Sequence, residues 1–212
     1  MKVYDLTHEI CPDMPVYPGT EPPTLTTANT YEKDFFKETL LTMFSHTGTH
    51  IDPPAHIFEG KMTLDAFPPE QFIGTALVID CTALSQGESI TMATLAPYGE
   101  DVARVDFLLF YTGYDRYWGT EAYFGSFPCI DGEVLELILQ GNYKGIGFDT
   151  ISLDPMESLV RHRQLFSEKN ILNIENLCNL GALPRSPVMF ACLPIKVQDS
   201  DGAPARAIAW EL

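Results

Sequence analysis

Residues 46–56 have the sequence His-Thr-Gly-Thr-His-Ile-Asp-Pro-Pro-Ala-His, and this run holds three of the five histidines in the 212-residue chain. His46 and His50 lie four residues apart, a spacing that also occurs in zinc-binding helices. A helix is disfavoured here because the glycine and threonine between them are weak helix formers and two prolines follow Asp52. We therefore predict an extended strand, on which the side chains of residues 46, 48, 50 and 52 share one face.

That face would bring two imidazoles and one carboxylate together. His46, His50 and Asp52 form a donor set that suits Zn²⁺, with Mn²⁺ or Fe²⁺ as alternatives. His56 follows the turn that the two prolines impose, so it would lie near the metal without being needed to hold it. An imidazole in that place is suited to act as a general acid or base, and we assign His56 a catalytic role.

Short apolar runs rich in β-branched and aromatic residues predict buried strands on either side of this segment. These runs cover residues 2–6, 40–44, 75–80, 105–111 and 144–148.

Two segments have helical patterns. Residues 131–140 place apolar side chains at helical spacing, and Gly141 follows as a stop signal. A second helix is predicted from Asp154 to about Lys169, with Asp154 as N-cap, Pro155 in the first turn and Glu157 completing a capping box. Strands alternate with helices in the second half, so we predict an α/β fold with some parallel pairing.

Length and composition restrict the class of protein. A chain of 212 residues can bury a sizeable core, and no sequence boundary divides it, so we expect one domain over residues 1–212. The net charge of −16 repels phosphate backbones and anionic lipid surfaces, which argues against nucleic-acid and membrane partners. Five scattered cysteines without a C-x-x-C pair indicate free thiols, and no segment has signal-peptide or membrane-span character. We expect a cytoplasmic protein.

Two further residues, His162 and Glu175, each have more than one possible role when considered singly. His162 lies on the inward face of the second predicted helix, where a histidine is more often a packed core residue than a ligand. Glu175 lies in a predicted strand around residues 170–176, and a lone glutamate is usually exposed. The residues alone leave both metal binding and these structural roles open.

The run at residues 46–56 resembles the H-x-G-T-H-x-D-x-P-x-H signature of the cyclase-like metal hydrolases, a family that includes bacterial kynurenine formamidases and isatin hydrolases. Further segments resemble the family over nearly the whole chain. They are Tyr-Asp-Leu-Thr at 4–7, Pro-Val-Tyr-Pro-Gly at 15–19, the Gly-x-Asp segment at 147–155, Leu-Pro-Ile-Lys at 193–196 and Asp-Gly-Ala-Pro-Ala-Arg at 201–206.

This resemblance implies a swivelling β/β/α fold with mixed sheets, assembled as a homodimer or larger homo-oligomer. It also implies a site for one or two zinc ions, with Mn²⁺ possible in their place. In that arrangement one ion is held by His46, His50 and Asp52, and the second is bound by His162. Asp52 and Glu175 bridge the two ions.

The activity that the resemblance implies is arylformamidase-like. Metal-activated water would hydrolyse N-formylkynurenine to kynurenine and formate, a step of tryptophan catabolism, while His56 passes a proton to the departing amine. Two alternatives stay open: a hydrolase of a cyclic amide or lactone, as in isatin hydrolase, and a non-catalytic metal- or ligand-binding protein on the same scaffold. No Gly-x-Ser-x-Gly elbow occurs, which disfavours a serine hydrolase.

Aromatic residues offer candidates for substrate contact. Tyr17 could stack on an aryl ring or simply pack against the protein. The aromatic stretch 111–127 could likewise line a pocket, or pack on the core or on a second subunit.

Overall fold

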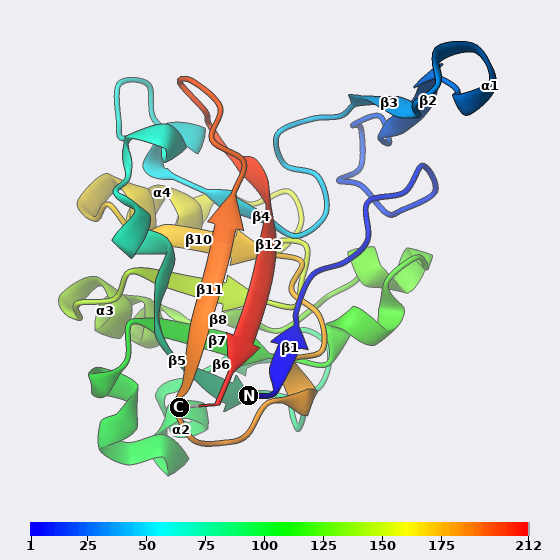
Figure 1. The fold of residues 1–212 in the computed structure, drawn as a ribbon. Helices are drawn as coiled ribbons and strands as arrows, with labels where there is room; N and C mark the ends of the chain where they lie inside the picture. The colour runs from blue at the N-terminus through cyan, green and yellow to red at the C-terminus, as the bar shows by residue number, and fades with distance from the viewer. Residues whose placement is uncertain (212) are drawn as a thin grey trace.

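The computed structural model describes residues 1–211, and its centre is a closed, mixed barrel of seven strands (Figure 1). Around the barrel the strands follow the order β4 (His50–Asp52), β10 (Leu172–Glu175), β9 (Gly145–Phe148), β7 (Phe107–Tyr111), β5 (Ile73–Asp80), β11 (Val188–Pro194) and β12 (Ala203–Trp210). Pairing of β12 with β4 closes the ring. Strands β5, β7, β9 and β10 run parallel and the other pairs are antiparallel. The predicted α/β class with mixed strand directions is confirmed.

The parallel strands are buried on both faces, which explains why they are continuous apolar runs in the sequence. Along β5, Ala76 and Val78 belong to the cluster inside the barrel, whereas Leu77 and Ile79 belong to the cluster outside it. Helices α3 (Gly132–Gln140) and α4 (Val160–Glu168) supply the outer cluster with apolar side chains such as Ile138 and Leu165. The helices therefore cover one side of the barrel and hold its parallel strands in place.

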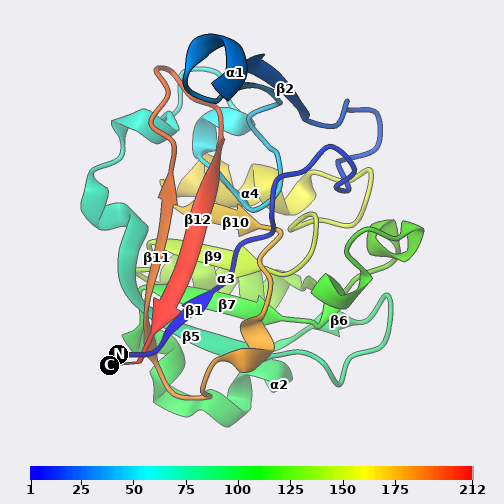
Figure 2. The ribbon, with the colours of Figure 1, turned by 45° about the vertical axis from the view of Figure 1, so that its right-hand side comes forward.

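The remaining elements are short. Strand β1 (Val3–Asp5) lengthens the sheet beside β12, β6 (Ser89–Ile90) pairs with β8 (Cys129–Ile130), and α2 (Met92–Leu95) is a single turn. Strands β2 (Thr24–Asn29) and β3 (Glu38–Thr42) form a hairpin that carries α1 (Tyr31–Asp34) at its tip. In both views this hairpin stands away from the barrel (Figures 1 and 2), and none of its strand or helix residues is buried.

Local sequence patterns predicted several elements well. The helix expected over 131–140 is α3, in which the Asp131 carboxylate caps the first turn by accepting a hydrogen bond from the Val134 amide. The strands expected at 2–6, 75–80, 105–111 and 144–148 are present as β1, β5, β7 and β9. The strand expected at 40–44 lies two residues earlier, as β3 in the projecting hairpin.

Two local predictions were wrong. The histidine segment is not one strand, because only residues 50–52 pair in a sheet and Gly48 has a φ of +64°, which turns the chain. Helix α4 begins at Val160 rather than at Asp154, and Glu157 has a φ of +67° instead of completing a capping box. In both places tertiary contacts override the local pattern. None of the helices within residues 1–211 combines the length and apolar character needed to cross a membrane.

Candidate metal centre

The register between β4 and β10 places four polar side chains on one face of the barrel wall. Glu175 pairs with His50 and Asn173 pairs with Asp52, while Ile51 pairs with Ile174 between them. Because side chains alternate along a strand, the two isoleucines point into the apolar barrel interior and the four polar residues point the other way. All four are buried.

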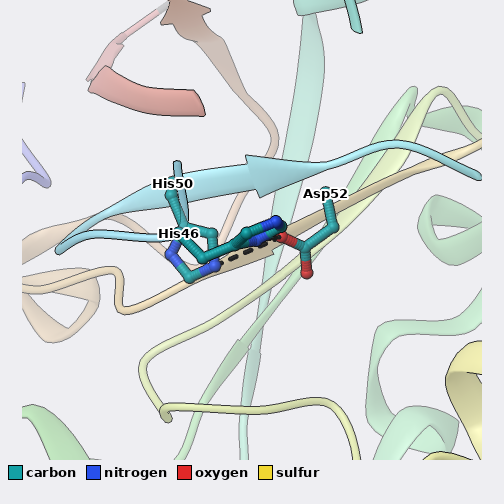
Figure 3. Close-up of side chains that lie close together, drawn as sticks. All are labelled: His46, His50 and Asp52. Atoms are coloured by element: carbon teal, nitrogen blue, oxygen red, sulfur yellow. Dashed lines mark hydrogen bonds and ion pairs between the residues drawn. The ribbon is translucent and has the colours of Figure 1, made fainter. Parts of the chain in front are cut away.

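His46 reaches this face from the turn that precedes β4 (Figure 3). Its Nδ1 lies 2.7 Å from Asp52 Oδ1, and His50 Nε2 lies 3.2 Å from the same oxygen. The predicted convergence of these three side chains is present, although a turn and not a straight strand produces it. A Cβ on Gly202 would lie within 3.0 Å of the His46 ring, so glycine is needed at that position.

His162 approaches the cluster from α4, which packs against the outside of the barrel. Its Nε2 lies 3.2 Å from Glu175 Oε1 and 3.8 Å from Asp52 Oδ2. Asp154 accepts hydrogen bonds from the backbone amides of Arg161 and His162, and also from His162 Nδ1 at 2.9 Å. Asp154 therefore does stabilise the start of α4, but across the five-residue loop 155–159, and the same carboxylate fixes the orientation of the His162 ring.

Two of the imidazoles are held so that one nitrogen faces the cluster. His162 donates from Nδ1 to Asp154, and His50 donates from Nδ1 to the carbonyl oxygen of Gly48 at 2.8 Å. Their Nε2 atoms therefore face the carboxylates of the cluster, which is the orientation found for histidines that bind metal. The Nε2 of His46 lies 3.4 Å from Asp201 Oδ2, so this ring too contacts a second carboxylate.

The charged groups of the cluster shift one another's pKa values. Burial alone would raise the pKa of Asp52, but His50 and His46 outweigh it and hold that pKa well below its usual value. Burial likewise opposes protonation of His46, yet Asp52 and Asp201 raise its pKa to about 10. Burial would lower the pKa of His162, whereas Asp154, Asp52 and Glu175 raise it well above its usual value. The buried carboxylates thus draw positive charge into the site.

This donor set fits divalent cations. His46, His50 and Asp52, here named the outer trio, can bring one ligand atom each within 4.8 Å of one another. Asp52, His162 and Glu175, the inner trio, do the same and share Asp52 with the first set. The five residues named as ligands in the sequence analysis are therefore brought together.

A cavity of about 500 Å³ opens onto the cluster. His56, from a short 3₁₀ turn over Pro54–His56, lines it with its ring centroid 4.0 Å from that of His46. Burial is the main cause that lowers the pKa of His56. Tyr17 also lines the cavity and is half-exposed, whereas no residue of the aromatic stretch 111–127 is among the lining residues. That stretch packs mainly against itself, with Tyr114, Tyr123 and Phe127 in one buried cluster.

Sequence reasoning missed three residues at this site, namely Asn173, Asp201 and the ring-orienting role of Asp154. Asn173 carried a usable signal, because a residue two positions before Glu175 on a strand must share its face. Asp154 and Asp201 lie in segments that resemble the family, but spacing along the chain did not predict their contacts, since loops bring them to His162 and His46.

Known proteins resemble this chain in sequence and in fold. A family model described as "Putative cyclase" matches residues 4–155. The chain belongs to this cyclase family. The cyclase is 29% identical to a kynurenine formamidase from Erythrobacter litoralis, over all of this chain and 94% of that protein.

Solved structures agree with this assignment. The cyclase matches isatin hydrolase A from Ralstonia solanacearum with a TM-score of 0.86 and 25% identity, over 98% of this chain and 91% of that one. It matches a structure described as a "predicted metal-dependent hydrolase" from Bacillus stearothermophilus with a TM-score of 0.79 and 28% identity, over 98% and 97% of the two chains. The resemblance inferred from the sequence is confirmed.

Replacing Asp154 by alanine should destabilise the cyclase by about 3 kcal/mol, because two backbone amides of α4 and the His162 ring lose their acceptor. Asp131→Ala is the matched control, since it removes only one capping bond, at α3, and should cost about 1 kcal/mol. Urea unfolding of both variants measures the difference. Equal losses would contradict the double role of Asp154.

Proposed function

We propose that this cyclase is a metal-dependent amidohydrolase that cleaves N-formyl aryl amines, with N-formylkynurenine as its first candidate substrate. The observation that supports this most directly is the cluster of three imidazoles and two carboxylates beneath a cavity, in which every side chain except that of His46 is buried. The kynurenine formamidase relative supports the substrate, which would place the enzyme in tryptophan catabolism.

The outer trio is proposed to hold one ion and the inner trio the second, with Asp52 common to both. Glu175 would also reach the outer ion, since its Oε2 lies 3.7 Å from His50 Nε2. A divalent ion in such a site lowers the pKa of water and polarises a carbonyl oxygen. The two imidazoles of the outer trio favour Zn²⁺, and Mn²⁺ is the alternative. Gly48 and Asp154 keep His50 and His162 turned toward the cluster, so the protein orients its donors before any ion arrives.

His56 is proposed to move the proton. It lines the cavity beside His46 and belongs to neither trio, although with His46 and Asp201 it forms a third, more exposed group of possible ligands. Its lowered pKa favours the neutral imidazole. A neutral imidazole can take a proton at one nitrogen and deliver it to the leaving amine. Tyr17 lines the same cavity, where its ring can stack on an aryl group of the substrate.

A cyclic amide hydrolase is the second candidate, favoured by the likeness to isatin hydrolase A. It would use the same residues, since opening a cyclic amide also needs an activated water and a proton for the departing nitrogen. Turnover of alternative substrates separates the two activities.

Removal of metal should abolish hydrolysis. Protein treated with a chelator and then dialysed should lose N-formylkynurenine hydrolysis at least about 100-fold, and added Zn²⁺ or Mn²⁺ should restore it. Metal content is measured by mass spectrometry, and isatin and a simple lactone are assayed in parallel. Purified protein without stoichiometric divalent metal, and without activity after metal addition, would refute the hydrolase proposal.

Replacing His56 by glutamine should lower kcat by about 10²–10⁴-fold while leaving bound metal unchanged, because the side chain carries protons and is not needed as a ligand. Metal content of the variant, measured beside its turnover, is the internal control. Full turnover with metal retained would show that another group carries the proton.

We also propose that the β2–β3 hairpin docks on a second copy of the chain, giving the homodimer that the family resemblance implies. The hairpin stands away from the barrel (Figures 1 and 2). It and its flanks expose large apolar side chains, an arrangement typical of interfaces. They are Leu25, Tyr31, Phe35, Phe36, Leu40, Leu41 and Phe44, with Phe35 exposed by 90%.

The aspartate substitution Leu40→Asp should convert the dimer to monomer, because it places a charge in the apolar contact. Val197→Asp, at a valine outside the hairpin that is exposed by 52% against 59% for Leu40, should leave the dimer intact. Light scattering coupled to size exclusion measures the mass of each variant. A monomeric parent protein at micromolar concentration, or a dimer that survives Leu40→Asp, would refute this interface.

A further inference from the structure

Asn173 is a fully buried polar residue at the centre of the candidate metal centre. It lies on β10 opposite Asp52 and two residues before Glu175, so its side chain shares their face of the barrel wall. Its position is fixed by the sheet register and not by a flexible loop. A buried amide normally has partners for both its oxygen and its nitrogen.

The amide nitrogen of Asn173 contacts one atom of every member of the inner trio. It lies 3.0 Å from Asp52 Oδ2, 2.8 Å from Glu175 Oε1 and 3.2 Å from His162 Nε2. The two carboxylate oxygens accept from this nitrogen, whereas the role of His162 Nε2 depends on the tautomer of the ring. An NH₂ group has two hydrogens, one for each of these two carboxylate oxygens. The nitrogen therefore lies beside the three atoms that would ligate the inner ion, as a partial substitute for a cation.

The amide oxygen of Asn173, unlike the nitrogen, has no hydrogen-bond partner within residues 1–211, and it is buried. A half-turn of the amide exchanges oxygen and nitrogen without moving the rest of the side chain. That turn would direct the oxygen toward two carboxylate oxygens, which is repulsive unless a cation lies among them. An ion bound among these carboxylate oxygens would give the amide oxygen the partner that it lacks here.

We propose that Asn173 Oδ1 is a fourth protein ligand of the inner ion and that the amide turns when this ion binds. The inner set then has three oxygens and one nitrogen, whereas the outer trio has two nitrogens and one oxygen. Oxygen-rich sets suit harder cations, so the inner position favours Mn²⁺ and the outer position favours Zn²⁺. This inference rests on the metal-binding part of the proposed function and not on its substrate.

Metal titration of two variants of the full chain tests the role of Asn173. Asn173→Leu removes the oxygen at similar size, and Asn173→Asp keeps an oxygen in the same place. Equilibrium dialysis with metal analysis should give two Mn²⁺ per parent chain. Asn173→Leu should bind the second Mn²⁺ roughly 10–100-fold more weakly, and Asn173→Asp should retain it. Asn142→Leu, the same change at an exposed loop residue, is the matched control and should retain both ions.

Two titration outcomes would overturn the inference. One is an Asn173→Leu variant that binds both ions with parental affinity. The other is a parent chain that binds only one ion at saturating Mn²⁺.

A crystal structure of the metal-loaded parent protein, with anomalous scattering to locate manganese, gives a test that does not depend on a variant folding. Asn173 Oδ1 within about 2.0–2.6 Å of the inner ion is the expected result. An amide nitrogen still directed at Asp52 and Glu175 beside a bound inner ion would overturn it. Neither measurement uses turnover, so a protein that binds two ions through Asn173 but hydrolyses no formyl amide refutes the proposed function alone.

Discussion

The antiparallel pairing of β4 with β10 is the constraint on which the rest of this structure depends. Strand β4 is only three residues long, yet it fills the gap between β10 and β12 and so closes the barrel. The same pairs that close it bring His50 opposite Glu175 and Asp52 opposite Asn173. A shift of one residue would turn the isoleucines outward and the charged groups into the apolar interior. Fold and site are therefore fixed by one register.

Concentrating buried charge on this face opposes folding, because each carboxylate loses its water shell. The structure offsets that cost with neighbours of opposite charge and with donors. Asp52, for example, lies close to four such side chains, those of His46, His50, His162 and Asn173. Such a cluster is a weak source of stability and a strong attractor for divalent cations, which is what a site built for metal chemistry needs.

Outside the cluster, most of the supporting contacts come from loops. Asp154 orients His162 from the segment before α4, Asp201 contacts His46 from the segment before β12, and the Gly48 carbonyl fixes His50. Asn176 supports that carbonyl in turn by donating to it at 2.9 Å, and Tyr123 donates to the Asn176 oxygen. The aromatic segment that does not line the cavity thus still reaches the site, through a chain of hydrogen bonds.

The sequence by itself determined those features that depend on neighbours along the chain. The alternation that places His50 and Asp52 on one face, the capped helix α3 and the apolar parallel strands all follow from local periodicity. Local patterns failed where long-range contacts compete. The positive φ of Gly48 breaks the predicted strand, and α4 starts late because Asp154 caps it across a loop. Strands β11 and β12 escaped prediction, although they carry much of the barrel wall.

Only the tertiary structure decided whether His162 and Glu175 join the cluster and how Asn173 meets them. Each is ambiguous alone, because a single buried histidine, glutamate or asparagine has many structural uses. The order of the strands and the packing of α4 on the barrel bring these side chains together. Both link residues more than a hundred positions apart in the sequence, such as Asp52 and Asn173. The segment at residues 46–56 could specify half of a metal site from its own spacing. The other half required the barrel to close.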